Sequence, residues 1–304
     1  MKQHSEWLLQ PARNINTPHT HTPHKKIHCT NQTLSSEMAR AHLHSLFVLT
    51  TLMFIFISPS DSILEGGDDV YVAKVSSPVK PKKVDLALYY EPQCPFCANF
   101  IVNVLVKVFQ TDLKTIVSLR LVPWGNAQVI NGTTICQHGE NECYLNTIHA
   151  CAIKAWPEVI KHFSFIRCIE AEIPGMQVKH SQDVETAWRK CADYQGLAQE
   201  PIDNCYNSGE GTKLSLGYGN ETDYLKPPHE FVPWVTVNNV ALREDFPNYI
   251  QYVCKAYKGK SIKACKSHLS SSTLKEASVH PVCYAKQTRN RFSQQKLRRL
   301  GGKR

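Results

Sequence analysis

Three absences narrow the class of protein to which this chain can belong. No glycine-rich nucleotide-binding fingerprint accompanies its cysteines, so we expect no bound cofactor. The longest apolar run, residues 46–57, has twelve residues, whereas a transmembrane helix needs about 20, so we expect no stable membrane span in the mature chain. Charged residues make up only 20% of the 304 residues and hydrophobic residues 42%, which excludes collagen-like, coiled-coil and wholly disordered chains.

The formal net charge of +9 is concentrated at the two ends of the sequence. Residues 1–60 hold five basic and two acidic residues, and residues 286–304 hold eight basic residues and no acidic one. The segment 61–285 therefore carries a net charge of −2. Because the basic tail has almost no interleaved aromatic residues, we expect no nucleic-acid partner.

The apolar run 46–57 has the flanks of a secretory signal peptide. Arg40 and His42 precede it and the small or polar residues 58–62 follow, which is the order of n-region, h-region and cleavage site. We expect cleavage between Ser60 and Ser62. The alternative is that this run is a buried core segment.

The residues upstream of Met38 are polar and rich in histidine, without apolar periodicity. We interpret residues 1–37 as an upstream start or a removed leader; a metal-binding histidine tract is the alternative. Residues 1–62 are therefore expected to be an N-terminal extension plus signal peptide, outside the folded domain.

Cysteine is abundant, with twelve residues or about 4% of the chain, a content that is ordinary for secreted proteins and high for cytosolic ones. Together with the signal peptide, this content predicts a secretory-pathway protein that is secreted or lysosomal, or vacuolar in a plant. That route makes the sequons at Asn131 and Asn220 candidate glycosylation sites.

After a linker over residues 63–83, the hydrophobic pattern predicts an α/β unit. Strand-like segments at 84–90 and 116–122 flank an apolar helix that begins at Pro95, as in a parallel βαβ unit. The polar residues of this helix form one thin stripe, which indicates a largely buried helix; they are Asn99, Asn103, Lys107 and Gln110.

Residues from about 131 to 225 predict a helical insertion stapled by disulfides. Short helical patterns cover 142–156, 158–170 and 184–195, and we find no strand-like alternation there. The chain then returns to strand character at 231–237, with an Asn238-Asn239 hairpin turn, a strand at 240–242 and a final helix at 246–257. We expect the domain to span 84–265, and the Ser-rich, then basic tail 266–304 to be disordered.

Cys94-Pro95-Phe96-Cys97 is a Cys-x-x-Cys placed directly after a strand and at the start of a helix. There the helix dipole and unpaired backbone N–H groups stabilise a thiolate and lower the pKa of the first cysteine. We therefore predict that Cys94 is exposed and nucleophilic and that Cys97 is more buried and acts second. The alternatives are a structural disulfide and half of a zinc site.

Val232-Pro233 lies just before a short strand, at the place where a loop would face the Cys-x-x-Cys. We predict that Val232, Pro233, Pro95 and Phe96 line a groove for an extended substrate. The sequence leaves open whether Pro233 is cis or trans.

Residues 136–151 have the form C-Q-H-G-x2-E-C-x2-N-x4-C. This motif resembles the signature of the gamma-interferon-inducible lysosomal thiol reductase (GILT) family, and the resemblance extends from about 84 to 265. It implies a thioredoxin-like fold with a helical insertion and a reductase of protein disulfides at acidic pH. It also implies that Cys94 is the nucleophile and Cys97 the resolving thiol.

The other cysteines of the mature chain are odd in number, so at least one is unpaired or pairs between chains. Thiolates with His138 could bind zinc, but the spacing matches no common zinc pattern, and we predict structural disulfides and no metal. For His138 and Glu142 we favour a structural role over support of the active site. The structural disulfide candidates, whose connectivity is open, are Cys136, Cys143, Cys151, Cys168, Cys191, Cys205, Cys254 and Cys265.

The sequence thus predicts a thiol reductase that acts on disulfide-containing protein substrates and is reduced in turn by an external small thiol. The alternatives are a disulfide oxidase or isomerase of the secretory pathway, because the motif does not set the reduction potential, and a non-catalytic, disulfide-stapled glycoprotein.

Overall fold

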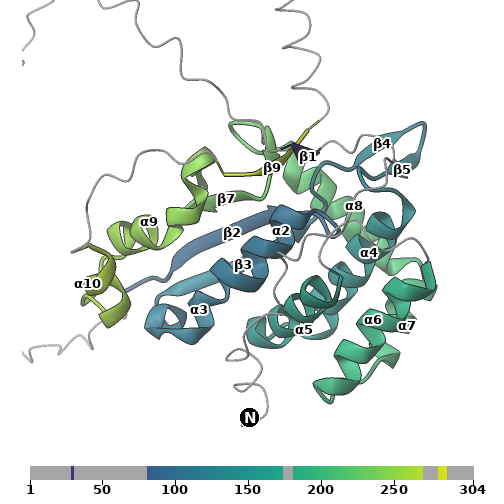
Figure 1. Ribbon diagram of the computed structural model, residues 1–304, viewed down its shortest axis with the longest axis horizontal. Helices are drawn as coiled ribbons and strands as arrows, with labels where there is room; N and C mark the ends of the chain where they lie inside the picture. The colour runs from purple at the N-terminus through teal and green to yellow at the C-terminus, as the bar shows by residue number, and fades with distance from the viewer. Residues whose placement is uncertain (1–28, 31–80, 174–180, 270–279, 286–304) are drawn as a thin grey trace, which may run out of the picture. The chain divides into compact units, whose positions relative to one another are not determined.

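A four-stranded sheet with the order β3-β2-β7-β8 forms the centre of the fold (Figure 1). The computed structural model describes residues 29–30, 81–173, 181–269 and 280–285. Strand β2 (Val84–Tyr90) is parallel to β3 (Val117–Pro123) and antiparallel to β7 (Trp234–Val237). Because β2 lies between two neighbours, most of its side chains are buried.

The helix that follows β2 is continuous but changes its winding. It runs from α2 (Pro95–Asn99) through the π-helical η1 (Phe100–Leu105) to α3 (Lys107–Gln110), and the 3₁₀ turn η2 (Asp112–Thr115) leads into β3. The predicted polar stripe is exposed and the remaining face is largely buried. The predicted βαβ unit is thus confirmed.

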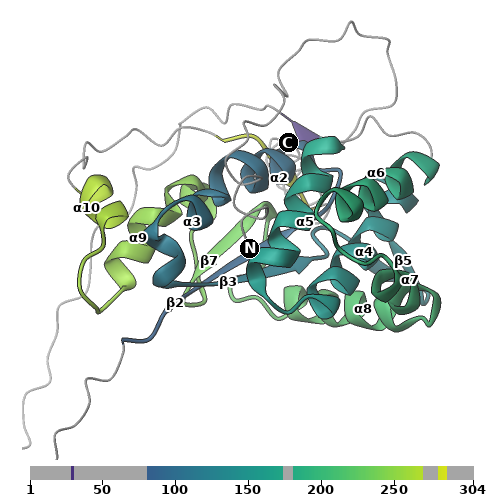
Figure 2. The ribbon, with the colours of Figure 1, turned by 90° about the horizontal axis from the view of Figure 1, so that it is seen from below.

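The insertion contains five helices among its described residues. They lie together, apart from the helices at the C-terminal end of the domain (Figure 2). Their bounds are α4 (Glu140–Ala155), α5 (Val159–Glu172), α6 (Ser181–Tyr194), α7 (Glu200–Asn207) and α8 (Glu210–Asp223). The first three match the predicted patterns, and the last two were not predicted individually.

The predicted absence of strands in the insertion is wrong at its start. A hairpin of β4 (Gln128–Ile130) and β5 (Thr133–Ile135) turns at Asn131-Gly132, where both residues have positive φ. An Asn-Gly pair suits such a turn because both residues tolerate positive φ. The strands are short and largely exposed, so they carry no hydrophobic alternation.

The C-terminal part of the domain follows the prediction closely. The Asn238-Asn239 turn joins β7 to β8 (Val240–Ala241), and both asparagines have positive φ. The final helix begins later than predicted, since η3 (Arg243–Asn248) contains Pro247 and precedes α9 (Tyr249–Ala256). Proline lacks the N–H needed inside an α-helix.

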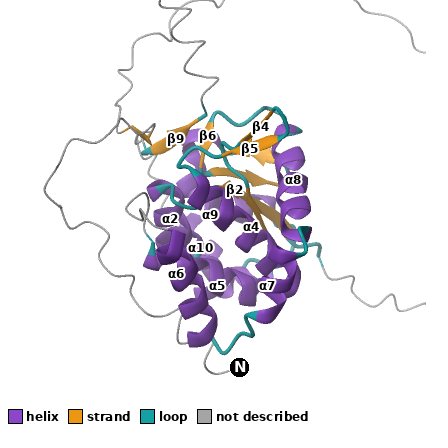
Figure 3. Cartoon of the chain, turned by 90° about the vertical axis from the view of Figure 1, so that its right-hand side faces the viewer, coloured by secondary structure: helices purple, strands orange, loops and turns teal. Residues whose placement is uncertain are grey.

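A second, three-stranded sheet corrects two expectations. Strand β9 (Val282–Tyr284) lies between β6 (Phe231–Val232) and β1 (Cys29–Thr30) and is antiparallel to both. The segment 1–62 therefore contributes a strand, and the tail 266–304 is not wholly disordered. Helix α10 (Lys263–Leu269) also crosses the predicted domain boundary. Figure 3 shows β9 and β6 at the same end of the domain as the β4–β5 hairpin.

Four disulfides join the eight cysteines named as structural candidates. Three of them link neighbouring helices and one closes the loop before α4. The pairs are Cys136–Cys143, Cys151–Cys205, Cys168–Cys191 and Cys254–Cys265. Cys283 is disulfide-bonded as well, and its partner is not among these eight cysteines.

The described residues contain no helix long and apolar enough to cross a bilayer. The predicted h-region 46–57 lies outside the described residues, as do the linker residues before Pro81 and residues 286–304.

A buried histidine makes the stability of this fold depend on pH. His149 of α4 is fully buried and its Nδ1 lies 3.0 Å from the Tyr90 hydroxyl. Burial lowers the pKa of His149 to about 3. At pH values between about 3 and 6.5, His149 is protonated in the unfolded chain but stays neutral in the folded chain. The free energy of unfolding therefore falls as the pH falls through this range.

We therefore expect the free energy of unfolding of the wild type to lose roughly 2 kcal/mol more than that of His149→Gln between pH 6.5 and pH 5. Denaturant titrations of both proteins at several pH values measure this difference. Any destabilisation by the substitution itself is present at every pH and cancels in the comparison. A difference that does not change with pH would contradict the prediction.

Candidate active site

The Cys-x-x-Cys lies where the sequence predicted, between the end of β2 and the start of α2. Residues 91–93 form the turn, in which Gln93 has a φ of 66°. Cys94 is the N-cap of α2 in an extended conformation, and its carbonyl accepts a hydrogen bond from the Ala98 N–H at 3.0 Å. Pro95 occupies the first turn, where its missing N–H is no loss.

Both thiols of the motif are free, and both are buried. The prediction that Cys94 is exposed, with a lowered pKa, is therefore wrong for this structure. Burial is the largest effect and raises the pKa of Cys94. Hydrogen bonds from the Cys97 thiol and from the N–H groups of Phe96 and Cys97 oppose this rise.

Burial raises the pKa of Cys97 well above its usual range, and donation of its hydrogen bond to Cys94 adds to the rise. The shared hydrogen bond thus favours the thiolate on Cys94 over that on Cys97. The division of labour between the two thiols stays a prediction, and it would use this order.

Glu91, three residues before Cys94, is a fully buried carboxyl group that the sequence analysis did not single out. Its Oε2 accepts a hydrogen bond from the Asn126 N–H at 2.7 Å, and its Oε1 lies 3.6 Å from His138 Nδ1. Burial and the neighbouring Glu142 raise the pKa of Glu91 well above its usual range, against the opposing effects of His138 and Asn126. The site therefore holds an acid that stays protonated at pH values where an exposed glutamate is ionised.

Gly125 allows the Glu91 side chain to approach the turn after β3. Its φ is +61°, and a Cβ at this position would lie 2.4 Å from both Cβ and Oε2 of Glu91. Only glycine fits both the conformation and the space.

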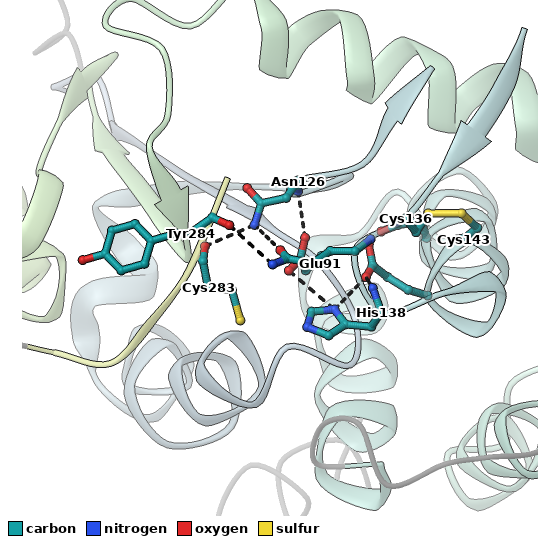
Figure 4. A network of polar contacts seen from close by, with 10 residues as sticks. Glu91, Asn126, Cys136, His138, Cys143, Cys283 and Tyr284 are labelled. Carbon is teal, nitrogen blue, oxygen red and sulfur yellow. Dashed lines mark hydrogen bonds and ion pairs between the residues drawn. A yellow bond between two sulfur atoms is a disulfide. The ribbon is translucent and has the colours of Figure 1, made fainter. Parts of the chain in front are cut away.

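The residues of the C-Q-H-G motif form a loop that brings His138 beside Glu91 (Figure 4). Glu142 accepts hydrogen bonds from the N–H of Gln137 at 3.3 Å and of His138 at 2.6 Å, and its Oε2 lies 2.6 Å from His138 Nδ1. Gly139, with a φ of 96°, is the N-cap of α4. Glu142 thus braces the loop, as the predicted structural role implied, but His138 also contacts Glu91 beside the motif.

The predicted groove residues come together only in part. The Val232–Pro233 bond is cis, and Val232 pairs in register with Cys283 of β9. The Sγ of Cys283, the Sγ of Cys94 and a carboxylate oxygen of Glu91 lie within 4.8 Å of one another. Val232 is therefore near Cys94 with β9 beside both, whereas Pro95 and Phe96 are half-buried on α2.

Among the described residues, two groups bring enough donor atoms together to be considered for a metal ion: Glu91 with Cys94 and Cys283, and Glu91 with His138 and Glu142. In the first group the Cys283 sulfur belongs to a disulfide and is not a thiolate ligand. In the second group the donors are bonded to one another and to backbone N–H groups. Cys136, Cys143 and Cys151, the alternative zinc ligands with His138, form disulfides. The candidate glycosylation residues Asn131 and Asn220 are both exposed.

Three residues of the site, Glu91, Asn126 and Cys283, were missed from the sequence. Glu91 offered a signal, because an acid directly after a buried strand and just before a Cys-x-x-Cys is well placed to act on it. Asn126 lies in a turn and Cys283 lies in the tail, and neither has a local pattern that indicates a site.

Comparisons with known proteins show which proteins this chain is similar to. A family model described as gamma interferon inducible lysosomal thiol reductase (GILT) matches residues 85–195. A gamma-interferon-responsive lysosomal thiol protein of Arabidopsis thaliana is 43% identical over 199 residues, covering 64% of this chain and 80% of that protein. The gamma-interferon-inducible lysosomal thiol reductase of Mus musculus is 33% identical over 207 residues, covering 66% and 76%.

Among solved structures, DsbA from Mycobacterium tuberculosis in its reduced form is similar with a TM-score of 0.42 and 17% identity. The match covers 66% of this chain and 94% of that one.

Proposed function

This chain belongs to the gamma interferon inducible lysosomal thiol reductase (GILT) family, and from that membership and the site geometry we propose that Cys94 attacks a disulfide of a protein substrate and that Cys97 resolves the mixed disulfide. The chain is a disulfide oxidoreductase of the thiol reductase type. The observation that carries the assignment of roles is the convergence of three hydrogen bonds on Cys94, from the Cys97 thiol and two N–H groups of α2.

The reaction transfers two electrons from the dithiol to the substrate. The Cys94 thiolate forms a bond to one substrate sulfur, the substrate disulfide breaks, and the other sulfur leaves and takes a proton. The Cys97 thiolate then attacks Cys94, which forms the Cys94–Cys97 disulfide and releases the second substrate thiol. An external small thiol reduces this disulfide and restores the enzyme.

Glu91 supports this chemistry at acidic pH. As an anion it would raise the pKa of both thiols, since it is among the groups that act on each of them. Its own raised pKa keeps it protonated and uncharged in acid. Its carboxyl group, with an oxygen within 4.8 Å of the Cys94 Sγ, then lies beside the attacking thiol without opposing the thiolate on Cys94.

The expected place of action is an acidic compartment of the secretory pathway, either lysosomal or vacuolar. The names of the Arabidopsis thaliana and Mus musculus relatives include the word lysosomal. Four disulfides between described residues also suit an oxidising route of synthesis.

Trapping of the mixed disulfide tests the two roles. With unfolded, disulfide-intact ribonuclease A as substrate, the Cys97→Ser variant should accumulate a covalent enzyme–substrate complex on non-reducing gels, at about pH 5 and at pH 7. The Cys94→Ser variant should form none, because the attacking thiol is absent. Equal trapping by both variants would overturn the assignment.

A further inference from the structure

Strand β9 lies beside the active-site thiols in the position of a bound peptide. It is antiparallel to β6, with Val232 opposite Cys283 and Phe231 opposite Tyr284. The Ala285 N–H extends the pairing by donating a hydrogen bond to the Glu230 carbonyl at 3.0 Å. β6 ends at the cis Val232–Pro233 bond, so the pairing reaches the loop that was predicted to bind an extended substrate.

Two side-chain amides hold the backbone of β9 in addition to β6 (Figure 4). Asn126 Nδ2 donates to the Cys283 carbonyl at 3.1 Å, and Gln137 Nε2 donates to the Tyr284 carbonyl at 3.4 Å. Asn126 Nδ2 also donates to Gln137 Oε1 at 2.6 Å, which fixes the two amides relative to each other. Both contacts are to main-chain atoms, so they would serve any extended peptide in this place.

The same strand brings a disulfide to a free thiol. Cys283 is disulfide-bonded and fully buried. Its Sγ lies within 4.8 Å of the Sγ of Cys94, which is free. β9 also contacts α2, and this contact accounts for the burial of a nucleophile that the helix start alone would leave open.

We propose that β9 occupies the substrate groove and that, in the full-length chain, the Cys283 disulfide is an internal substrate of Cys94, with Asn126 and Gln137 as positioning residues for the backbone of any bound strand. This inference rests on the proposed function of the two thiols. A protein substrate must then displace β9 before its own disulfide reaches Cys94, so the strand is also an inhibitor of the site.

The internal step follows the chemistry of the external one. The Cys94 thiolate bonds to Cys283, and the sulfur previously bonded to Cys283 leaves as a thiolate and takes a proton. The Cys97 thiolate next bonds to Cys94 and releases the Cys283 thiol. One disulfide is reduced, the Cys94–Cys97 dithiol is oxidised, and a small-thiol reductant restores it.

The test uses the full-length chain carrying Cys97→Ser, with no added substrate. After acid quench, thiol blocking and proteolysis, mass spectrometry should find a disulfide-linked peptide pair containing Cys94 and Cys283. The matched control with Cys94→Ser added should lack it. If Cys97→Ser traps ribonuclease A but never links Cys94 to Cys283, the internal substrate is overturned while the proposed function stands. If it traps neither, the proposed function fails as well.

Steady-state kinetics test the occupied groove separately. Tyr284→Ala keeps the Cys283 disulfide but removes the ring contact with Phe231, whose centroids are 6.0 Å apart. It should raise kcat/KM for ribonuclease A several-fold, because the strand leaves more readily. Adding Gln137→Ala should then raise KM about three- to tenfold, as expected for one lost hydrogen bond, with kcat little changed. An unchanged kcat/KM in the first variant or an unchanged KM in the second would contradict the proposal.

Discussion

Replacement of Cys94 by serine is expected to lower kcat/KM for the reduction of protein disulfides by at least about 10³-fold. A serine hydroxyl is a far weaker nucleophile toward sulfur. Cys97, the other free thiol among the described residues, cannot take over the first attack, because its pKa is raised well above the usual range and it donates its hydrogen bond to Cys94. Initial rates of ribonuclease A reduction with a small thiol as electron source, at about pH 5 and pH 7, measure the effect.

The matched control for Cys94→Ser is a change of two cysteines far from the site, Cys254→Ala with Cys265→Ala, which removes a disulfide between α9 and α10. This control should retain most of the activity under conditions in which it is folded. Full activity of Cys94→Ser, with near-ultraviolet circular dichroism showing a native fold, would exclude Cys94 as the nucleophile.

The second large effect is expected on stability, from removal of the Cys151–Cys205 disulfide. This bond joins α4 to α7 across a sequence separation of 54 residues. In the chain-entropy description, a loop of that length contributes about 4 kcal/mol to the free energy of unfolding. Denaturant titration of the double variant Cys151→Ala, Cys205→Ala should show a loss of this order.

The Cys254–Cys265 pair again provides the comparison, because its sequence separation is only 11 residues. The same chain-entropy description predicts that this disulfide contributes about 3 kcal/mol to the free energy of unfolding. Removal of the Cys151–Cys205 disulfide should therefore lower the free energy of unfolding by more than removal of the Cys254–Cys265 disulfide does. The reverse order would show that native packing, and not the closed loop, determines what these disulfides contribute.

The insertion shows how far hydrophobic pattern alone leads. Helices α4, α5 and α6 were predicted because their apolar residues recur at helical spacing. The β4–β5 hairpin was missed because its strands of three residues each are largely exposed. Strand β9 was missed for a related reason: it is three residues long and exists because it pairs with β6, some fifty residues earlier in the chain. Pairing between distant segments leaves no periodic signal in either one.

The chemical identity of the site was readable from residues close together in the chain. A Cys-x-x-Cys after a strand and before a helix, and a C-Q-H-G motif with its following glutamate, are local patterns, and the helix start and the loop before α4 form where they predict. The burial of the two thiols and the direction of their pKa shifts could not be predicted from the sequence. Glu91, directly after β2, and Cys283 of the tail lie beside Cys94, and His138 of the insertion contacts Glu91. Only folding brings them together and excludes water, and it is this burial that raises the pKa of Cys94 where the helix terminus alone would lower it.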